Sequence, residues 1–133
     1  MINRVREYIN LQKENFINDL IRFVHIPSIS HHDDEIYPFG QECRNVLDEY
    51  AKNADEHGLK ARNFDYSCTA IAIDENDLEK PSQTVGIWSH GDVVPVGDGW
   101  IYPPFECTYE NGLIIGRGVQ DNKCACMAGI YTE

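Results

Sequence analysis

His90, Asp92 and Asp121 are the residues whose types and spacing indicate chemistry in this sequence. His90 and Asp92 stand two positions apart, and residues i and i+2 of an extended segment share a face. An imidazole supported by a carboxylate is a common metal-ligand arrangement in proteins. Asp121 follows a Gly-rich turn and precedes an apolar run, where a loop turns into a helix. We therefore expect His90 and Asp92 to point into one pocket, with the Asp121 carboxylate meeting His90 there.

The elements that must position these residues follow from the local pattern. Residues 84–89 contain the apolar run Val85-Gly86-Ile87-Trp88, which predicts a buried central strand. Such a strand would deliver His90 to its carboxyl end, where open α/β sheets place their ligands. Residues 122–131 are short, rich in small residues and compatible with a buried helix behind Asp121.

The rest of the chain predicts a mixture of helices and strands. Phe16, Leu20 and Val24 form one stripe of a helix over residues 3–24, which Pro27 ends. A second helix over residues 41–57 is expected to end at Gly58. The remaining predicted segments are strands at 59–65 and 68–74, a charged loop at 75–83, and a hairpin over 105–115 that turns at Asn111-Gly112.

Composition excludes several classes of protein. The formal net charge of −11 argues against nucleic acid, whose phosphates require clustered Lys and Arg. The sequence contains no run of 18 apolar residues, so it predicts no membrane span, and the first residues lack the apolar core of a signal peptide. Five cysteines, an odd number, fit a reducing compartment, so a cytoplasmic protein is expected. The length of 133 residues fits one ordinary domain.

The other motifs in the sequence give weaker evidence for functional sites or none. Gly116-x-Gly118 lacks the third glycine of a dinucleotide fingerprint and the Gly-Lys-Ser/Thr ending of a phosphate loop. Cys124-x-Cys126 lacks zinc-site spacing, and packing is the favoured role of both cysteines. Residues 31–34 could form a metal clip, but a solvated loop is favoured. Asp98 could be a ligand, but a role in the turn is favoured. For Trp100, Tyr102 and Phe105, a substrate wall and loop packing are equally plausible.

Three longer motifs carry a family resemblance: SHGDVVPVGDGW at 89–100, PPFE at 103–106 and GRGVQDNK at 116–123. Weaker similarities are IPSIS at 26–30 and PFGQE at 38–42. The chain resembles the dinuclear-metal peptidase and deacylase family that includes aminoacylase, glutamate carboxypeptidase and carnosinase. Within that family it is most similar to the PepV-type dipeptidase branch.

The resemblance implies roles for the three residues of the motif. His90 would be a terminal ligand to one metal ion, and Asp121 would bridge two ions. Asp92 would be the catalytic-site carboxylate that orients His90 and tunes the site. The implied cofactors are two divalent metal ions, zinc first, with manganese or cobalt also suited to such ligands. The peptide bond between Asp121 and Asn122 is expected to be cis.

The implied fold is an α/β three-layer sandwich with a central mixed sheet, incomplete at the C-terminus. Residues 1–133 would form the N-terminal part of the catalytic domain, with the rest of that domain and the lid or dimerisation domain absent. The family also needs an adjacent pair of glutamates, a further acidic ligand and a late histidine, and this sequence contains no Glu-Glu pair. Cys124 stands where the family usually has glycine.

The implied function is metal-dependent hydrolysis of dipeptides of the carnosinase-like Xaa-His kind, with a small peptide as substrate. Without its general-base glutamate, the isolated chain is expected to be inactive. One alternative is an N-acyl or N-succinyl amino acid deacylase of the same family. Another is a non-catalytic, degenerate fragment, which the missing Glu-Glu pair and Cys124 favour. The oligomeric state is left open.

Overall fold

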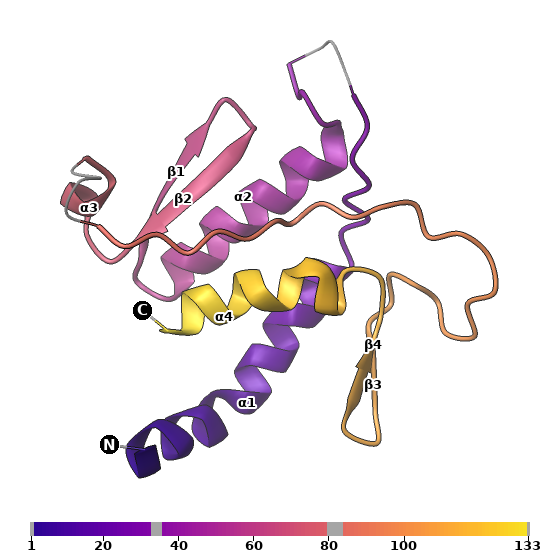
Figure 1. The fold of residues 1–133 in the computed structure, drawn as a ribbon, viewed down its shortest axis with the longest axis horizontal. Helices are drawn as coiled ribbons and strands as arrows, with labels where there is room; N and C mark the ends of the chain where they lie inside the picture. The colour runs from indigo at the N-terminus through magenta and orange to yellow at the C-terminus, as the bar shows by residue number, and fades with distance from the viewer. Residues whose placement is uncertain (1, 33–35, 80–83, 133) are drawn as a thin grey trace.

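The computed structural model describes residues 2–32, 36–79 and 84–132. Three helices cross near the centre of the molecule, and two β-hairpins lie on opposite sides of them (Figure 1). The described elements are α1 (Ile2–Val24), α2 (Gln41–Glu56), β1 (Lys60–Phe64), β2 (Cys68–Ala72), α3 (Glu75–Glu79), β3 (Thr108–Glu110), β4 (Leu113–Ile115), a π-helical turn η2 (Val119–Lys123) and α4 (Cys124–Thr132).

The core lies where the C-terminal half of α1 meets α2 and α4. Leu20, Phe23 and Met127 are completely buried there. The Phe23 ring stacks on Tyr50 of α2, with ring centroids 4.1 Å apart. The predicted helix over residues 3–24 is confirmed, because its apolar stripe falls on the buried side of α1.

The end of α2 also confirms its prediction. Gly58 has φ +79°, a conformation that costs glycine little. Its N–H donates to Asp55 O at 2.9 Å, and the Leu59 N–H donates to Ala54 O at 2.8 Å. These two bonds form a Schellman motif, which ends the helix and turns the chain into β1.

Both predicted hairpins are present as antiparallel pairs. In the first, Lys60 pairs with Ala72 at one end and Phe64 with Cys68 at the other. In the second, the strands are only three residues each and join through Asn111 and Gly112, which both have positive φ. That conformation is the type I′ turn that Asn-Gly favours, so the hairpin is shorter than predicted but turns where expected.

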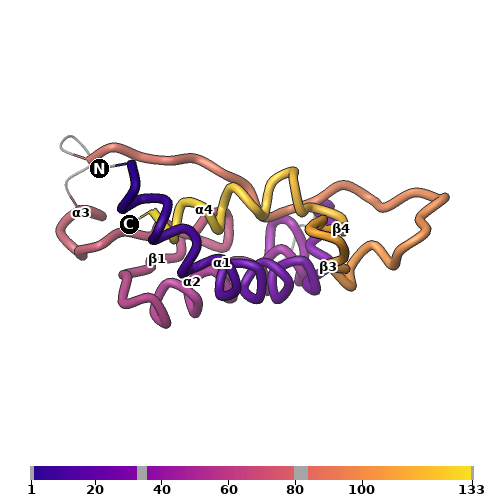
Figure 2. Tube along the Cα trace, turned by 90° about the horizontal axis from the view of Figure 1, so that it is seen from below, coloured from indigo at the N-terminus to yellow at the C-terminus, as the bar shows by residue number. Residues whose placement is uncertain are grey.

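The predicted central strand at residues 84–89 is wrong for the part of the chain described. None of these residues forms a strand or a bridge with the described part of the chain, and the nearest bridge along the chain is an isolated parallel one between Ile29 and Val93. Val85, Ile87 and Trp88 are 94%, 71% and 89% exposed. The segment follows one edge of the molecule and leads into a loop that projects beyond the helices (Figures 1 and 2). An apolar run forms a strand only together with a pairing partner, and none of the described segments pairs with it through backbone hydrogen bonds.

The charged loop predicted at residues 75–83 is also wrong in its first part, since Glu75–Glu79 forms the short helix α3. Asp74 supplies the reason. Its Oδ1 accepts hydrogen bonds from the backbone N and the Nδ2 of Asn76, both at 2.7 Å, which caps the start of the helix. Residues 80–83 lie outside the described part of the chain.

No described helix combines the length and apolar character needed to cross a bilayer. The five cysteines all lie in the described part of the chain, and none of them forms a disulfide there.

A polar network joins the three central helices around Asp19. Its Oδ2 accepts hydrogen bonds from Tyr131 Oη at 2.8 Å and from His57 Nε2 at 3.2 Å. Arg22 Nη1 lies 3.1 Å from Asp19 Oδ1 and 2.8 Å from Glu56 Oε2. Burial raises the pKa of the Asp19 carboxyl, but the Asn53 side chain, the hydrogen bonds from Tyr131 and His57, and the Arg22 charge outweigh it and leave the pKa below its ordinary value.

Asp19→Asn is therefore expected to destabilise the chain at neutral pH by about 1.5–3 kcal/mol, the range for hydrogen bonds to a charged group. A folded-state pKa below the unfolded value contributes stability above the unfolded pKa, and this contribution is lost as the pH falls through the folded pKa. Urea unfolding of the wild type and of Asp19→Asn, at pH 7 and below pH ~4, measures the destabilisation at neutral pH and its loss at low pH. A gap between wild type and variant that stays constant across this range would contradict the role assigned to the ionised carboxyl.

Candidate metal centre

The segment that follows α1 holds the His90–Asp92 motif in place. Ser28 donates its hydroxyl to Gly91 O at 2.6 Å, and its carbonyl oxygen accepts the Val93 N–H at 2.8 Å. Ser30 Oγ donates to Asp92 Oδ2 at 2.9 Å. The motif is thus fixed by a short parallel contact instead of the full strand that the sequence predicts.

Gly91 lets this segment approach α2 closely. A Cβ built on Gly91 would lie 2.7 Å from Tyr50 Cε2, and the Tyr50 ring is itself stacked in the core. Gly91→Ala is expected to cost about 1–3 kcal/mol of unfolding free energy, as overpacking of a well-packed site does. Gly129→Ala in α4 is the matched control, because its Cβ would meet nothing within 4 Å. Thermal unfolding compares them, and equal stability of the two variants would contradict the close contact.

Asp121 lies in the turn between the second hairpin and α4. Gly118 starts this turn with φ +85°, and the Lys123 N–H donates to Gly118 O at 2.9 Å. Asp121 and Asn122 have non-helical dihedrals, and the peptide bond between them is cis, as the resemblance implies. The Asp121 side chain is 85% exposed, so both its oxygens are accessible.

The three predicted residues come together at His90. Its Nε2 lies 2.9 Å from Asp121 Oδ1, and its Nδ1 lies 3.3 Å from Asp92 Oδ1 and 3.2 Å from Asp92 O. Partial burial lowers the pKa of His90, but the hydrogen bonds to Asp92 and Asp121 outweigh it and raise the pKa above its ordinary value. Because an oxygen lies beside each ring nitrogen, the charged imidazolium, with both nitrogens protonated, is favoured when no cation is bound.

The donor set fits a divalent metal ion only in part. An imidazole nitrogen and a carboxylate oxygen converge at His90 Nε2 and Asp121 Oδ1, while Asp92 lies on the opposite side of the ring, where an orienting carboxylate belongs. Within the described residues, no three His, Cys, Asp or Glu side chains gather to hold an ion. The chemistry of these donors therefore suits one side of a metal site, and further ligands are needed to close it.

The structure also shows contacts around the site that sequence reasoning missed. Ser89 Oγ donates to Asn122 Oδ1 at 2.6 Å, and Cys126 Sγ donates to His90 O at 3.2 Å. Lys123 is completely buried and donates through Nζ to Phe23 O at 2.8 Å. The only one of these residues that the sequence could have indicated is Lys123, a lysine between the polar turn and an apolar helix. The other contacts join residues distant in sequence and leave no local pattern.

The loop after the motif is organised by Arg117. Its guanidinium donates to Val96 O at 3.1 Å and stacks over the Trp100 ring, 5.2 Å from the centroid. Trp100 Nε1 also donates to Val96 O, at 2.8 Å. These contacts favour loop packing over a substrate wall for Trp100. Asp98 lies in the same projecting loop, beside Trp100 and Tyr102, and within the described residues it joins no group of three possible metal ligands. Residues 33–34 of the predicted metal clip lie outside the described residues.

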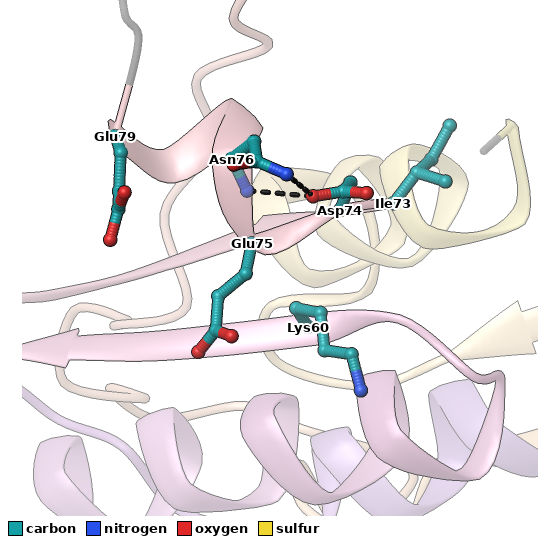
Figure 3. Close-up of a pocket in the computed structure, with 6 residues that line it drawn as sticks. All are labelled: Lys60, Ile73, Asp74, Glu75, Asn76 and Glu79. Carbon is teal, nitrogen blue, oxygen red and sulfur yellow. Dashed lines mark hydrogen bonds between the residues drawn. The ribbon is translucent and has the colours of Figure 1, made fainter.

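A shallow groove lies elsewhere on the molecule, between the first hairpin and α3 (Figure 3). Its lining residues are Lys60, Ile73, Asp74, Glu75, Asn76 and Glu79. The one interaction drawn between them is the Asp74–Asn76 cap of α3. None of the three motif residues contributes to it, so the groove is separate from the candidate metal centre.

The C-terminal third of the chain matches the model of one protein family. Residues 86–132, which include all three motif residues, match the model of peptidase family M20/M25/M40. This match, with the relatives described below, confirms the resemblance to the dinuclear-metal peptidase and deacylase family.

Most of the chain is similar to a quarter-length part of longer relatives. The chain is 33% identical over 125 residues to "Putative dipeptidase YtjP" of Bacillus subtilis (strain 168), covering 90% of this chain and 25% of the relative. It is 32% identical over 130 residues to "Putative dipeptidase SAUSA300_1697" of Staphylococcus aureus (strain USA300), covering 95% and 26%. The chain thus spans about a quarter of the length of the curated relatives it matches.

A solved structure is similar over nearly the whole chain. Human carnosine dipeptidase 1 superposes with a TM-score of 0.68 and 23% sequence identity, covering 97% of this chain and 30% of that one. This likeness confirms the α/β fold class predicted from the sequence.

Proposed function

We propose that this chain supplies His90, Asp92 and Asp121 to the two-metal site of a dipeptidase. The observation that supports the proposal is the 2.9 Å approach of His90 Nε2 to Asp121 Oδ1, with Asp92 beside the other ring nitrogen. All three lie in the segment that matches the peptidase family. Zinc is the first candidate for the two ions, and manganese and cobalt also suit imidazole and carboxylate ligands.

Each residue would have a separate task in the reaction. Bound divalent ions supply the chemistry, since they lower the pKa of a bridging water and polarise the scissile carbonyl. His90 would offer Nε2 to one ion, and Asp92 would fix the ring by accepting a hydrogen bond from the Nδ1–H group. Asp121 would turn its two accessible oxygens to both ions.

The substrate proposal is a dipeptide, because the relatives above carry dipeptidase names. The finer proposal, a carnosinase-like Xaa-His dipeptide, rests on the family resemblance and the fold likeness to carnosine dipeptidase 1. We further propose that residues 1–133 act as part of a larger catalytic domain in the cytoplasm. Because the sequence holds no Glu-Glu pair to supply a general base, the chain by itself should not hydrolyse peptides.

The experiment has a binding arm and a hydrolysis arm. Calorimetric titration of the 133-residue chain with Zn²⁺ is expected to give a saturable site that EDTA removes. Incubation of the same chain with an Xaa-His dipeptide and with an N-acetyl amino acid should release no product.

The natural gene product is then assayed with both substrates, with and without EDTA. Chelator-sensitive cleavage of the dipeptide supports the dipeptidase, and cleavage of the N-acyl compound alone supports the deacylase. An absence of Zn²⁺ binding contradicts the proposal and favours a non-catalytic fragment.

A further inference from the structure

The two candidate ligands are poorly fixed by packing. The His90 side chain is 49% exposed and the Asp121 side chain is 85% exposed. Residues 84–89, which lead into His90, have no strand partner among the described residues. A metal site needs its donors held in place before the ion arrives, because otherwise binding must supply the free energy that orders them. Some contact other than side-chain burial must therefore hold His90 and Asp121 together.

A hydrogen bond between the chain neighbours of the two ligands provides that contact. Ser89 precedes His90, Asn122 follows Asp121, and Ser89 Oγ donates to Asn122 Oδ1 at 2.6 Å. This bond joins residues 33 positions apart and lies beside the His90–Asp121 contact of 2.9 Å. Both side chains are half-buried, so the bond is partly shielded from competing water.

The two contacts differ in what a metal ion does to them. An ion bound by His90 Nε2 and Asp121 Oδ1 replaces the direct contact between those atoms. The Ser89–Asn122 bond uses neither atom and can persist in the bound state. It therefore ties the two ligand segments together whether or not the ion is present.

We propose that Ser89 and Asn122 form a positioning pair that holds His90 and Asp121 at the separation needed to bind one divalent ion. The inference rests on the proposed metal site and adds two residues that act through the ligands and do not bind the ion themselves. Loss of either partner should weaken metal binding by about 10-fold, the lower range for residues that support a ligand. Because one bond carries the effect, the double variant should lose no more than either single variant.

The test is a Zn²⁺ competition titration against a chromophoric chelator, performed on the 133-residue chain. The variants are Ser89→Ala, Asn122→Ala and the double variant, with Ser89→Thr as the conservative variant that keeps a hydroxyl. Ser67→Ala and Asn10→Ala are matched controls, since both residues are exposed and far along the chain from the site. Urea unfolding midpoints are measured in parallel, because a merely structural role would lower stability and metal affinity together.

The expected result is weaker Zn²⁺ binding in both single variants, no further loss in the double variant, recovery in Ser89→Thr, and unchanged unfolding midpoints. Wild-type affinity in the single variants, or additive losses in the double variant, would overturn the positioning pair while leaving the metal site intact. Losses that follow the unfolding midpoints would overturn it as well. A wild-type chain that binds no Zn²⁺ would overturn the proposed function and this inference together, so the failures can be told apart.

Discussion

Lys123→Ala is expected to lower the free energy of unfolding by about 3–5 kcal/mol, the largest stability effect of any single substitution proposed for this chain. Lys123 is completely buried, and its Nζ donates to Phe23 O at 2.8 Å and to Ile26 O at 2.7 Å. Those carbonyls lie at and just beyond the end of α1, where the last groups of a helix lack intrahelical partners. The alanine variant would remove the Lys123 donor from both carbonyls, leaving Phe23 O with the Ile26 N–H at 3.2 Å and Ile26 O with the Ser28 N–H at 2.8 Å, and would open a cavity along the lost side chain.

The buried position also has an electrostatic cost. Burial lowers the pKa of Lys123 to about 8, although nearby groups such as Cys126 and Asp92 favour the charged form. The lysine therefore lies at a site that disfavours its charge, and its hydrogen bonds to the two carbonyls offset part of that cost. Since Lys123 comes two residues after Asp121, it anchors the turn bearing the candidate ligand to the end of α1.

Urea denaturation of three variants separates the contributions. Lys123→Met keeps most of the aliphatic volume and removes only the donor, so it should cost less than Lys123→Ala. Lys52→Ala is the control, because the Lys52 side chain is 63% exposed and makes only long surface ion pairs. If Lys123→Ala unfolded within about 0.5 kcal/mol of wild type, as surface substitutions do, the anchoring role would be refuted.

His90→Ala is expected to weaken Zn²⁺ binding by more than about 100-fold, beyond the cost of losing a residue that only supports a ligand. The variant removes the sole imidazole that the structure brings to Asp121 within the described residues. It leaves the Asp121 carboxylate without a nitrogen donor beside it, an arrangement less suited to zinc. Isothermal titration at pH 7 measures the change.

His25→Ala is the matched control for this prediction. The His25 Nε2 lies 3.1 Å from Glu106 O, so its hydrogen-bond partner is not one of the three motif residues. It should bind Zn²⁺ as wild type does. Equal weakening in both histidine variants would show that the ion binds histidines nonspecifically and would contradict the site at His90.

The sequence predicted best the features that depend on local chemistry. The positive φ values at Asn111 and Gly112 produce the turn that an Asn-Gly pair favours, and Gly58 ends α2 as a left-handed residue should. The spacing of His90 and Asp92 and the turn before Asp121 predicted a meeting that the structure reproduces. The metal-binding and catalytic roles of these residues stay predictions.

Features that depend on partners distant in sequence could not be predicted. Val85 and Ile87 alternate like a strand, yet pairing needs a neighbour that their own pattern does not identify. The Ser89–Asn122 bond spans 33 positions and leaves no periodic signal. α3 is a local failure, because the capping side chain of Asp74 outweighed the charged, loop-like composition that follows it.

The measurement that tests the metal site most directly is anomalous diffraction at the zinc edge from crystals of the zinc-loaded chain. The account predicts a peak about 2.0–2.2 Å from both His90 Nε2 and an Asp121 carboxylate oxygen, the usual lengths of zinc bonds to nitrogen and oxygen. Asp92 should remain on the Nδ1 side of the ring without contacting the ion. A peak at other histidines, or none near His90 in crystals shown to contain zinc, would contradict the account.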